Sequence, residues 1–145
     1  MPTLLLHLQF ESTGLHLPSK NDFKKWAYVS LRVDTEVTIR IVDELEGRAL
    51  NLAYRDRDYA TNVLTFPLTE TPHLMGDIVI CAPVVAKEAI EQNKTLMAHY
   101  AHLTVHGVLH LHGYDHENGY QAALMEGLEI SILHKLGYAN PYFVS

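Results

Sequence analysis

Residues 106–116 constrain the fold more than any other part of the sequence. His106 and His110 stand four positions apart in a stretch, residues 95–112, whose apolar residues recur at intervals of three and four. That periodicity predicts a helix, and four residues turn it by about 400°, so both imidazoles project from one face. Gly113 follows, and a glycine there can adopt the left-handed conformation that reverses a chain. The chain therefore needs a long helix and a sharp turn that returns His116 toward that face.

These three histidines also indicate a metal site. Three neutral imidazoles and one open position are the ligand set of a catalytic zinc site. The chain has ten histidines, so a pair at this spacing can arise by chance, and such rings also pack as ordinary core or surface residues. A third histidine after a glycine is a rarer coincidence and favours one ion per chain, bound by His106, His110 and His116. Zn²⁺ is the expected ion, with another divalent transition metal such as Ni²⁺ as the alternative.

Three other histidines lie near the predicted ligands. His112 faces another way on the helix and is not expected to bind the ion. His99 and His102 lie upstream on the same helix, where they either support the ligands or take solvent-facing or capping roles.

The histidine spacing matches the metzincin pattern H-E-x-x-H-x-x-G-x-x-H with one departure. Gly107 stands where those peptidases carry their glutamate general base. Peptide hydrolysis is therefore the weaker interpretation, although the three histidines are retained. A glycine at this position also lets another element or a substrate approach the helix closely.

Alternating and continuous apolar runs predict four strands. They are expected over residues 4–10, 37–42, 63–66 and 75–81, with Pro67 closing the third. The run Ile78-Val79-Ile80 in the fourth is typical of a strand buried on both faces.

Helices account for most of the remaining chain. They are expected over residues 21–29, from a cap at Asp43 to about residue 54, from Pro83 onward, over 95–112, and in a last helix that ends at Gly137. The last helix is expected to pack through Leu124, Leu128 and Ile132. Together these elements predict an α+β fold: a small mixed four-stranded sheet packed with about five to six helices, the metal site lying on the long helix of the C-terminal half and the following turn.

Length and composition limit the class of protein. The 145 residues fit one domain, 1–145. The single cysteine excludes an internal disulfide framework and a cysteine-rich zinc site. No apolar run approaches the roughly 18–20 residues of a membrane span, and the first residues lack the features of a secretory signal. We therefore expect a soluble, cytoplasmic protein that does not bind membranes.

The net charge of −6 argues against a broad RNA-binding surface. The one dense basic cluster contains Arg48, Arg55 and Arg57, interleaved with Asp56 and Asp58. It is either a local phosphate-binding patch or a solvated face with internal salt bridges.

Three segments resemble the signatures of one protein family. HGVLHLHGYDH at 106–116, LNLAYRDRDYATNVLTFP at 50–67 and GDIVI at 76–80 are similar to motifs of the bacterial YbeY-type endoribonucleases, also called rRNA maturation factors, and are spaced as in that family. The resemblance covers nearly the whole chain. It implies a zincin-like α+β fold with one zinc-type ion, His106, His110 and His116 as metal ligands, and Arg55 as the functional arginine near the metal.

The resemblance also implies an activity on RNA. The expected function is metal-dependent, single-strand-specific endoribonuclease action in small-subunit (16S) rRNA processing, ribosome maturation and quality control, with small-subunit ribosomal proteins and an assembly GTPase as partners. One alternative is a ribosome-assembly factor whose metal is mainly structural, and another is a zinc hydrolase of peptides or small amides. For Arg55 the alternative to phosphate binding is an ion pair with Asp56, Asp58 or Asp77.

Several residues near these motifs have two possible roles. Asp115 either orients a histidine or caps the last helix. Thr61, Asn62 and Thr65 either line an RNA groove or belong to a loop, and Tyr54, Tyr59 and Tyr114 either stack on unpaired bases or pack inside. Glu126 and Glu129 are either proton-transfer groups or, as expected, part of a solvated helix face. Met125 lies either beneath the metal, as in metzincins, or, as expected, in the core.

Overall fold

The computed structural model describes residues 1–14, 16–70 and 73–142. Within them the order of elements is β1 (Leu4–Glu11), α1 (Lys20–Val29), β2 (Thr35–Val42), α2 (Glu44–Arg55), β3 (Val63–Thr69), β4 (Leu74–Cys81), α3 (Ala82–Glu91), α4 (Leu96–Leu111) and α5 (Gly119–Lys135). These strands and helices confirm the predicted α+β class.

The strands form one mixed sheet in the order β1-β2-β4-β3. β1, β2 and β4 are parallel, and β3 pairs antiparallel with β4 at the edge. Pro67 lies inside β3 rather than closing it, so that part of the prediction was wrong. An edge strand tolerates proline because one side of its backbone has no partner strand, and the pairing is irregular between Pro67 and Thr69.

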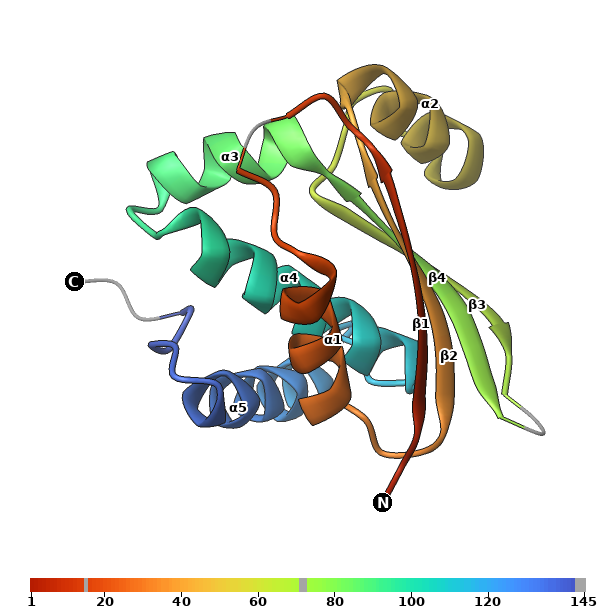
Figure 1. Cartoon of the computed structure of the whole chain (residues 1–145), viewed down its shortest axis with the longest axis vertical. Coiled ribbons are helices and arrows are strands. Elements are labelled where there is room, and N and C mark those ends of the chain that lie inside the picture. The colour runs from red at the N-terminus through yellow and green to blue at the C-terminus, as the bar shows by residue number, and fades with distance from the viewer. Residues whose placement is uncertain (15, 71–72, 143–145) are drawn as a thin grey trace.

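Helices cover both faces of the sheet (Figure 1). α1, α4 and α5 lie on one face, and α2 lies on the other. Ile78 and Ile80 of β4 point into the large core under α4, whereas Val79 and Cys81 belong to a smaller core that includes Leu50 of α2. The apolar run in β4 is therefore buried on both faces, as predicted.

Two glycines allow α4 to pack tightly against β4. A Cβ at Gly107 of α4 would lie 3.0 to 3.4 Å from the side-chain carbons of Ile78. A Cβ at Gly76 of β4 would collide with Leu111 at the end of α4. Gly107 therefore faces the sheet, and its missing side chain brings a strand close to α4 rather than a substrate.

The helix starts differ in how well the sequence predicted them. Ser19 caps α1 with a capping box, one residue before the helix begins at Lys20. Asp43 precedes α2, but its carboxylate accepts hydrogen bonds from Ser12 and Thr13 and does not cap the helix. Asn118, not Asp115, caps α5.

The buried face of α5 matches the predicted one in part, because Ile132 is buried and Leu128 packs against the core. Its buried residues are Met125, Glu129, Ile132 and Leu133, and Leu124 is exposed. Met125 is a core residue, as expected. No helix among the described residues is long and apolar enough to cross a membrane.

Candidate active site

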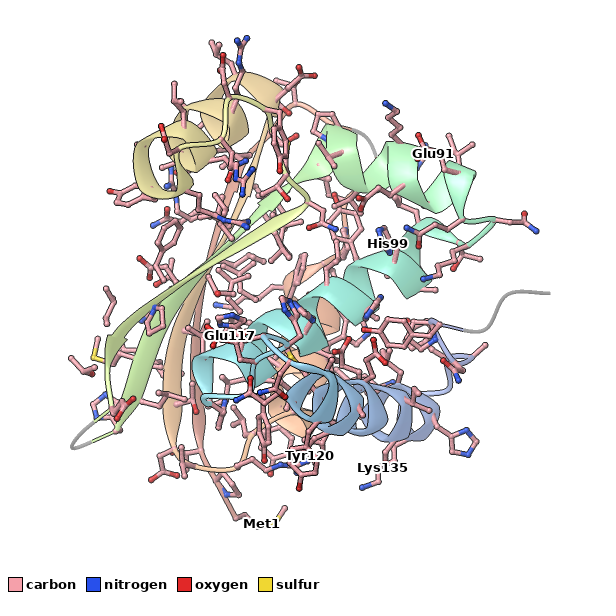
Figure 2. All side chains as sticks on the ribbon, turned by 180° about the vertical axis from the view of Figure 1, so that it is seen from behind. Met1, Glu91, His99, Glu117, Tyr120 and Lys135 are labelled. Atoms are coloured by element: carbon pink, nitrogen blue, oxygen red, sulfur yellow. The ribbon has the colours of Figure 1, made fainter. Side chains whose placement is uncertain are left out.

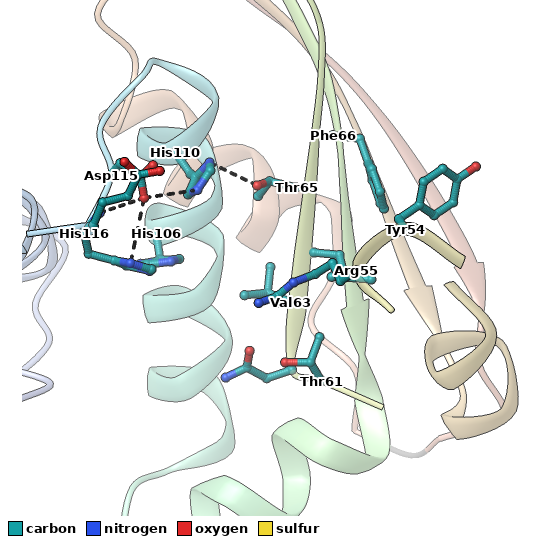
Figure 3. Close-up of a pocket in the computed structure, with 13 residues that line it drawn as sticks. Tyr54, Arg55, Thr61, Val63, Thr65, Phe66, His106, His110, Asp115 and His116 are labelled. Carbon is teal, nitrogen blue, oxygen red and sulfur yellow. Dashed lines mark hydrogen bonds and ion pairs between the residues drawn. The ribbon is translucent and has the colours of Figure 1, made fainter. Parts of the chain in front are cut away.

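A cleft of about 590 Å³ lies between α4 and the opposite segment formed by the end of α2 and β3 (Figure 3). Figure 2 views this side of the molecule, with Glu117 at the turn between α4 and α5. The cleft is lined by residues of both segments: Tyr54, Arg55, Thr61, Asn62, Val63, Leu64, Thr65, Phe66, His106, His110, Asp115, His116 and Glu117. It therefore brings together all four site residues that the sequence predicted.

The turn after α4 returns the third histidine to the first two. Gly113 has a φ of 96°, and the Tyr114 N–H donates to the Leu109 carbonyl. Only glycine adopts this backbone conformation without strain. The ring centroids of His106 and His116 are 5.6 Å apart, and the ring centroid of His110 lies 6.4 Å from each of these two. The three imidazoles therefore form one cluster on the α4 side of the cleft.

Two of the three rings have their Nδ1 atoms fixed by another element. Nδ1 of His106 lies 3.3 Å from Oε2 of Glu129 on α5. Nδ1 of His110 lies 3.1 Å from Oγ1 of Thr65 on β3. With Nδ1 engaged behind each ring, Nε2 is the nitrogen left to bind a ligand.

The cluster fits a metal ion in donor chemistry, since neutral imidazoles are common ligands of divalent transition metals. In the described part of the chain, however, no three His, Cys, Asp or Glu side chains are placed to hold an ion as they stand. The rings of His106 and His116 lie nearly parallel, with an interplanar angle of 24°. The His116 side chain is 57 % exposed on the turn, so packing does not fix its orientation.

The electrostatics of the cleft favour a neutral His110 beside an ionised Asp115. Burial lowers the pKa of His110, which keeps this ring neutral and able to bind a metal. The backbone N–H of His116 donates to Asp115 and lowers the pKa of that carboxyl group. Oδ1 of Asp115 lies 3.8 Å from both His110 Nε2 and His116 Nδ1, so Asp115 faces the histidines and does not cap α5.

Arg55 is the last residue of α2 and lines the cleft opposite the histidines (Figure 3). Within the described residues it makes no ion pair, so the alternative of a pair with Asp56, Asp58 or Asp77 was wrong. Asp58 instead binds Arg48, with 2.7 Å between Oδ1 and Nε. The guanidinium group of Arg55 is thus available to an anion in the cleft.

One of the three predicted tyrosines reaches the cleft. Tyr54 lines it, is 67 % exposed and packs edge-on against Phe66, with ring centroids 5.0 Å apart. Tyr59 borders a different cavity, and Tyr114 packs against the core beside Arg32. The predicted stacking roles of Tyr59 and Tyr114 at this site were therefore wrong.

The remaining histidines near α4 have structural partners. Nε2 of His112 accepts a hydrogen bond from the Arg32 N–H, and Nδ1 donates to the Val108 carbonyl. His99 is only 2 % exposed, and its Nε2 lies 2.9 Å from Oε1 of Glu88 on α3. Figure 2 shows His99 on the side of α4 that faces α3.

Glu129 is the main residue that sequence reasoning placed wrongly. It is 1 % exposed, not solvated. Burial raises its pKa, but hydrogen bonds with His102 and His106 outweigh burial and bring the value to about 2. The signal was its spacing: Glu129 follows Met125 by four residues and precedes Ile132 and Leu133 by three and four, so it lies on their buried stripe.

Phe66 was missed as well. Thr61, Asn62 and Thr65 do line the cleft, which was one of their two expected roles. Phe66 is the next residue of the same strand, but alternation along β3 turns it toward α2 and Tyr54.

Comparison with known proteins gives consistent matches over nearly the full chain. The family model described as "Endoribonuclease YbeY" matches residues 19–137. A protein of that name from Methylobacillus flagellatus is 62 % identical over 142 residues, covering 98 % of this chain and 95 % of the relative. Another, from Polaromonas naphthalenivorans, is 54 % identical and covers 97 % of each chain. The solution structure of TM1509 from Thermotoga maritima superposes with a TM-score of 0.62 at 27 % identity, covering 97 % of this chain and 100 % of that one.

Proposed function

Because the chain belongs to the YbeY endoribonuclease family, we propose that it is a metal-dependent endoribonuclease that cuts single-stranded RNA during maturation of small-subunit (16S) rRNA. One observation carries this proposal: a single cleft holds three clustered imidazoles on one side and, on the other, Arg55, which has no ion-pair partner among the described residues. A divalent cation and a guanidinium can both bind the oxygens of one phosphodiester, and the two sides of the cleft supply one each.

His106, His110 and His116 are the residues that would hold the ion, with Zn²⁺ as the expected metal and Ni²⁺ as an alternative. Neutral imidazoles suit both ions. In such a site a divalent ion polarises a phosphoryl oxygen and lowers the pKa of bound water. Glu129 and Thr65 bind the Nδ1 atoms of His106 and His110, which leaves the Nε2 atoms of both rings for the metal.

Arg55 is assigned to the substrate phosphate. Its planar guanidinium can donate two parallel hydrogen bonds to phosphate oxygens and stabilise the charge that develops during cleavage. Arg48 does not compete for this role, because its guanidinium is bound to Asp58 and does not line the cleft.

Asp115 is assigned to orientation of the histidine cluster. Its lowered pKa keeps it ionised, so it accepts hydrogen bonds and does not donate a proton to a leaving group. Its oxygen lies 3.8 Å from a nitrogen of His110 and of His116, close enough to influence how both rings turn.

The preference for single strands rests on the Arg55 side of the cleft. Tyr54 is exposed beside Arg55 and is supported by the partly buried Phe66, so an unpaired base can stack on the Tyr54 ring. A net charge of −6 provides little attraction for a duplex, which proteins grip through many phosphates.

Its setting in the cell follows from the proposed substrate. Work on small-subunit rRNA takes place in the cytoplasm and brings the protein into contact with small-subunit ribosomal proteins and an assembly GTPase. The peptidase alternative is disfavoured by packing, since a glutamate at position 107 would point its Cβ into Ile78.

Cleavage of a small-subunit rRNA 3′ fragment by the purified protein tests the proposal. We expect cutting of the free strand, little cutting of the same strand annealed to its complement, and loss of cutting on chelation or in His110→Ala. Equal or faster cutting of the annealed form would refute single-strand preference. Cutting that persists after the metal is removed would refute the metal mechanism.

A further inference from the structure

Glu129 is a buried carboxylate that does not line the cleft. It lies on α5 facing α4, and its two oxygens are shared among three groups. Oε1 lies 2.6 Å from Nε2 of His102 and accepts a hydrogen bond of 2.8 Å from the Tyr142 hydroxyl. Oε2 lies 3.3 Å from Nδ1 of His106. A buried charge is costly unless it is paired, so this network explains how the carboxylate is tolerated.

The network also determines which nitrogen of His106 carries the proton. A neutral imidazole has one N–H and one acceptor nitrogen, and a carboxylate can only accept. Nδ1 must therefore carry the proton that it donates to Glu129, and the lone pair is on Nε2. Since His106 lines the cleft, the carboxylate prepares this ring to act as a ligand there.

The partners of Glu129 hold it in place for this role. Its two other hydrogen bonds come from different parts of the chain, α4 and the segment after α5. Together they hold Oε1 and leave Oε2 to His106. A ligand is bound most tightly when its orientation is set before binding, because no rotamer freedom is then lost.

We propose that Glu129 is a positioning residue of the metal site, which fixes the orientation and the proton of His106 and thereby sets the affinity for the ion. This inference rests on the proposed function only in taking His106 as a ligand. The competing explanation is a purely structural bond between α4 and α5.

A second histidine of α4, His99, offers a matched control. Glu88 of α3 holds His99 with 2.9 Å between Oε1 and Nε2, a similar carboxylate–imidazole pair outside the histidine cluster. Glu88→Gln and Glu129→Gln therefore make the same chemical change. Only Glu129→Gln acts on a ring that we assign to the metal, that of His106.

Metal affinity is measured by titrating Zn²⁺ against a chromophoric chelator, without RNA. We expect Glu129→Gln to bind Zn²⁺ roughly 10–100-fold more weakly than the wild type, and Glu88→Gln to bind it with unchanged affinity. Melting temperatures in chelator report the structural contribution of each carboxylate separately. Unchanged Zn²⁺ affinity in Glu129→Gln would overturn the proposal, as would an equal loss in both variants.

A measurement on the wild type covers the case in which Glu129→Gln does not fold. Imidazole ¹⁵N chemical shifts of the metal-free protein, at a pH where the ring is neutral, should show His106 with its proton on Nδ1. A proton on Nε2 would overturn the proposal.

The outcomes also separate this inference from the proposed function. If the wild type binds no metal, both the positioning role of Glu129 and the proposed function are refuted. Tight metal binding that weakens in Glu129→Gln, but without RNA cleavage, would leave the positioning role intact and refute the nuclease.

Discussion

The two sides of the cleft differ in how firmly their functional groups are held. On the α4 side, His106 and His110 sit on a helix packed into the large core, and each ring is bonded through Nδ1 to a neighbouring element. On the opposite side, Arg55 ends a helix, makes no ion pair within the described residues, and has the exposed Tyr54 beside it. A metal ion benefits from ligands fixed in advance, whereas a substrate must enter and leave. The contrast supports the proposal that the ion binds on the first side and the RNA on the second.

Removing a ligand from the fixed side should have the largest effect. We expect His110→Ala to lose the metal and to reduce RNA cleavage by roughly 10³-fold or more, because no other side chain supplies its function. Metal content and cleavage rate are measured on the same preparation. His112→Ala is the control, since His112 lies two residues further along, at the end of α4, and makes hydrogen bonds with Arg32 and Val108. Normal metal content in His110→Ala would show that His110 is not a metal ligand.

Removing the guanidinium should impair cleavage and leave the metal in place. Arg55→Ala is expected to lower kcat by roughly 10²-fold, the loss typical of one group that stabilises transition-state charge. Arg55→Lys should recover only part of the activity, because a point charge does not replace a planar fork. Arg48→Ala, which removes an arginine bound to Asp58, should remain near wild type. Loss of metal in Arg55→Ala would contradict the division between the two sides.

The close packing of α4 on β4 predicts a change in stability. Gly107→Ala should lower the free energy of unfolding by about 1–3 kcal/mol, since the new Cβ meets Ile78 at 3.0 to 3.4 Å. Gly127→Ala in α5 is the control. A Cβ there meets nothing within 4 Å, and alanine in a helix should stabilise by roughly 0.5–1 kcal/mol. Denaturant unfolding measures both, and a neutral Gly107→Ala would show that α4 can shift.

The smallest effect is expected at Tyr54, the exposed ring of the aromatic pair that it forms with Phe66. Tyr54→Ala should weaken binding of single-stranded RNA about tenfold, within the range of roughly 1–3 kcal/mol per stacked base. Binding of the metal should not change. Tyr120→Ala is the control, because Tyr120 is 81 % exposed on α5 and does not line the cleft (Figure 2). Equal RNA affinity in the two variants would exclude Tyr54 as a stacking surface.

Local pattern determined much of this molecule. The spacing of His106, His110 and Gly113 encodes a helix, its end and a turn, because helical periodicity and the left-handed glycine conformation act over a few residues. The apolar run in β4 likewise encoded a strand buried on both faces. The helix, its end, the turn and the buried strand each depend on residues close in sequence, so the sequence predicts all of them.

Other features depend on how elements pack, and only the tertiary structure decided them. Leu124 and Glu129 both lie on α5, yet the carboxylate is buried and the leucine is exposed, because α5 turns its Met125–Ile132 face toward α4. That burial is favourable only where His102 and His106 supply hydrogen bonds, and they come from another helix. The sequence by itself determined which residues form the histidine cluster. The contacts of α4 with α5 and β3 decided which groups support that cluster. Spacing can place Glu129 on the buried stripe of α5, but packing sets its hydrogen-bond partners, because they are distant in sequence.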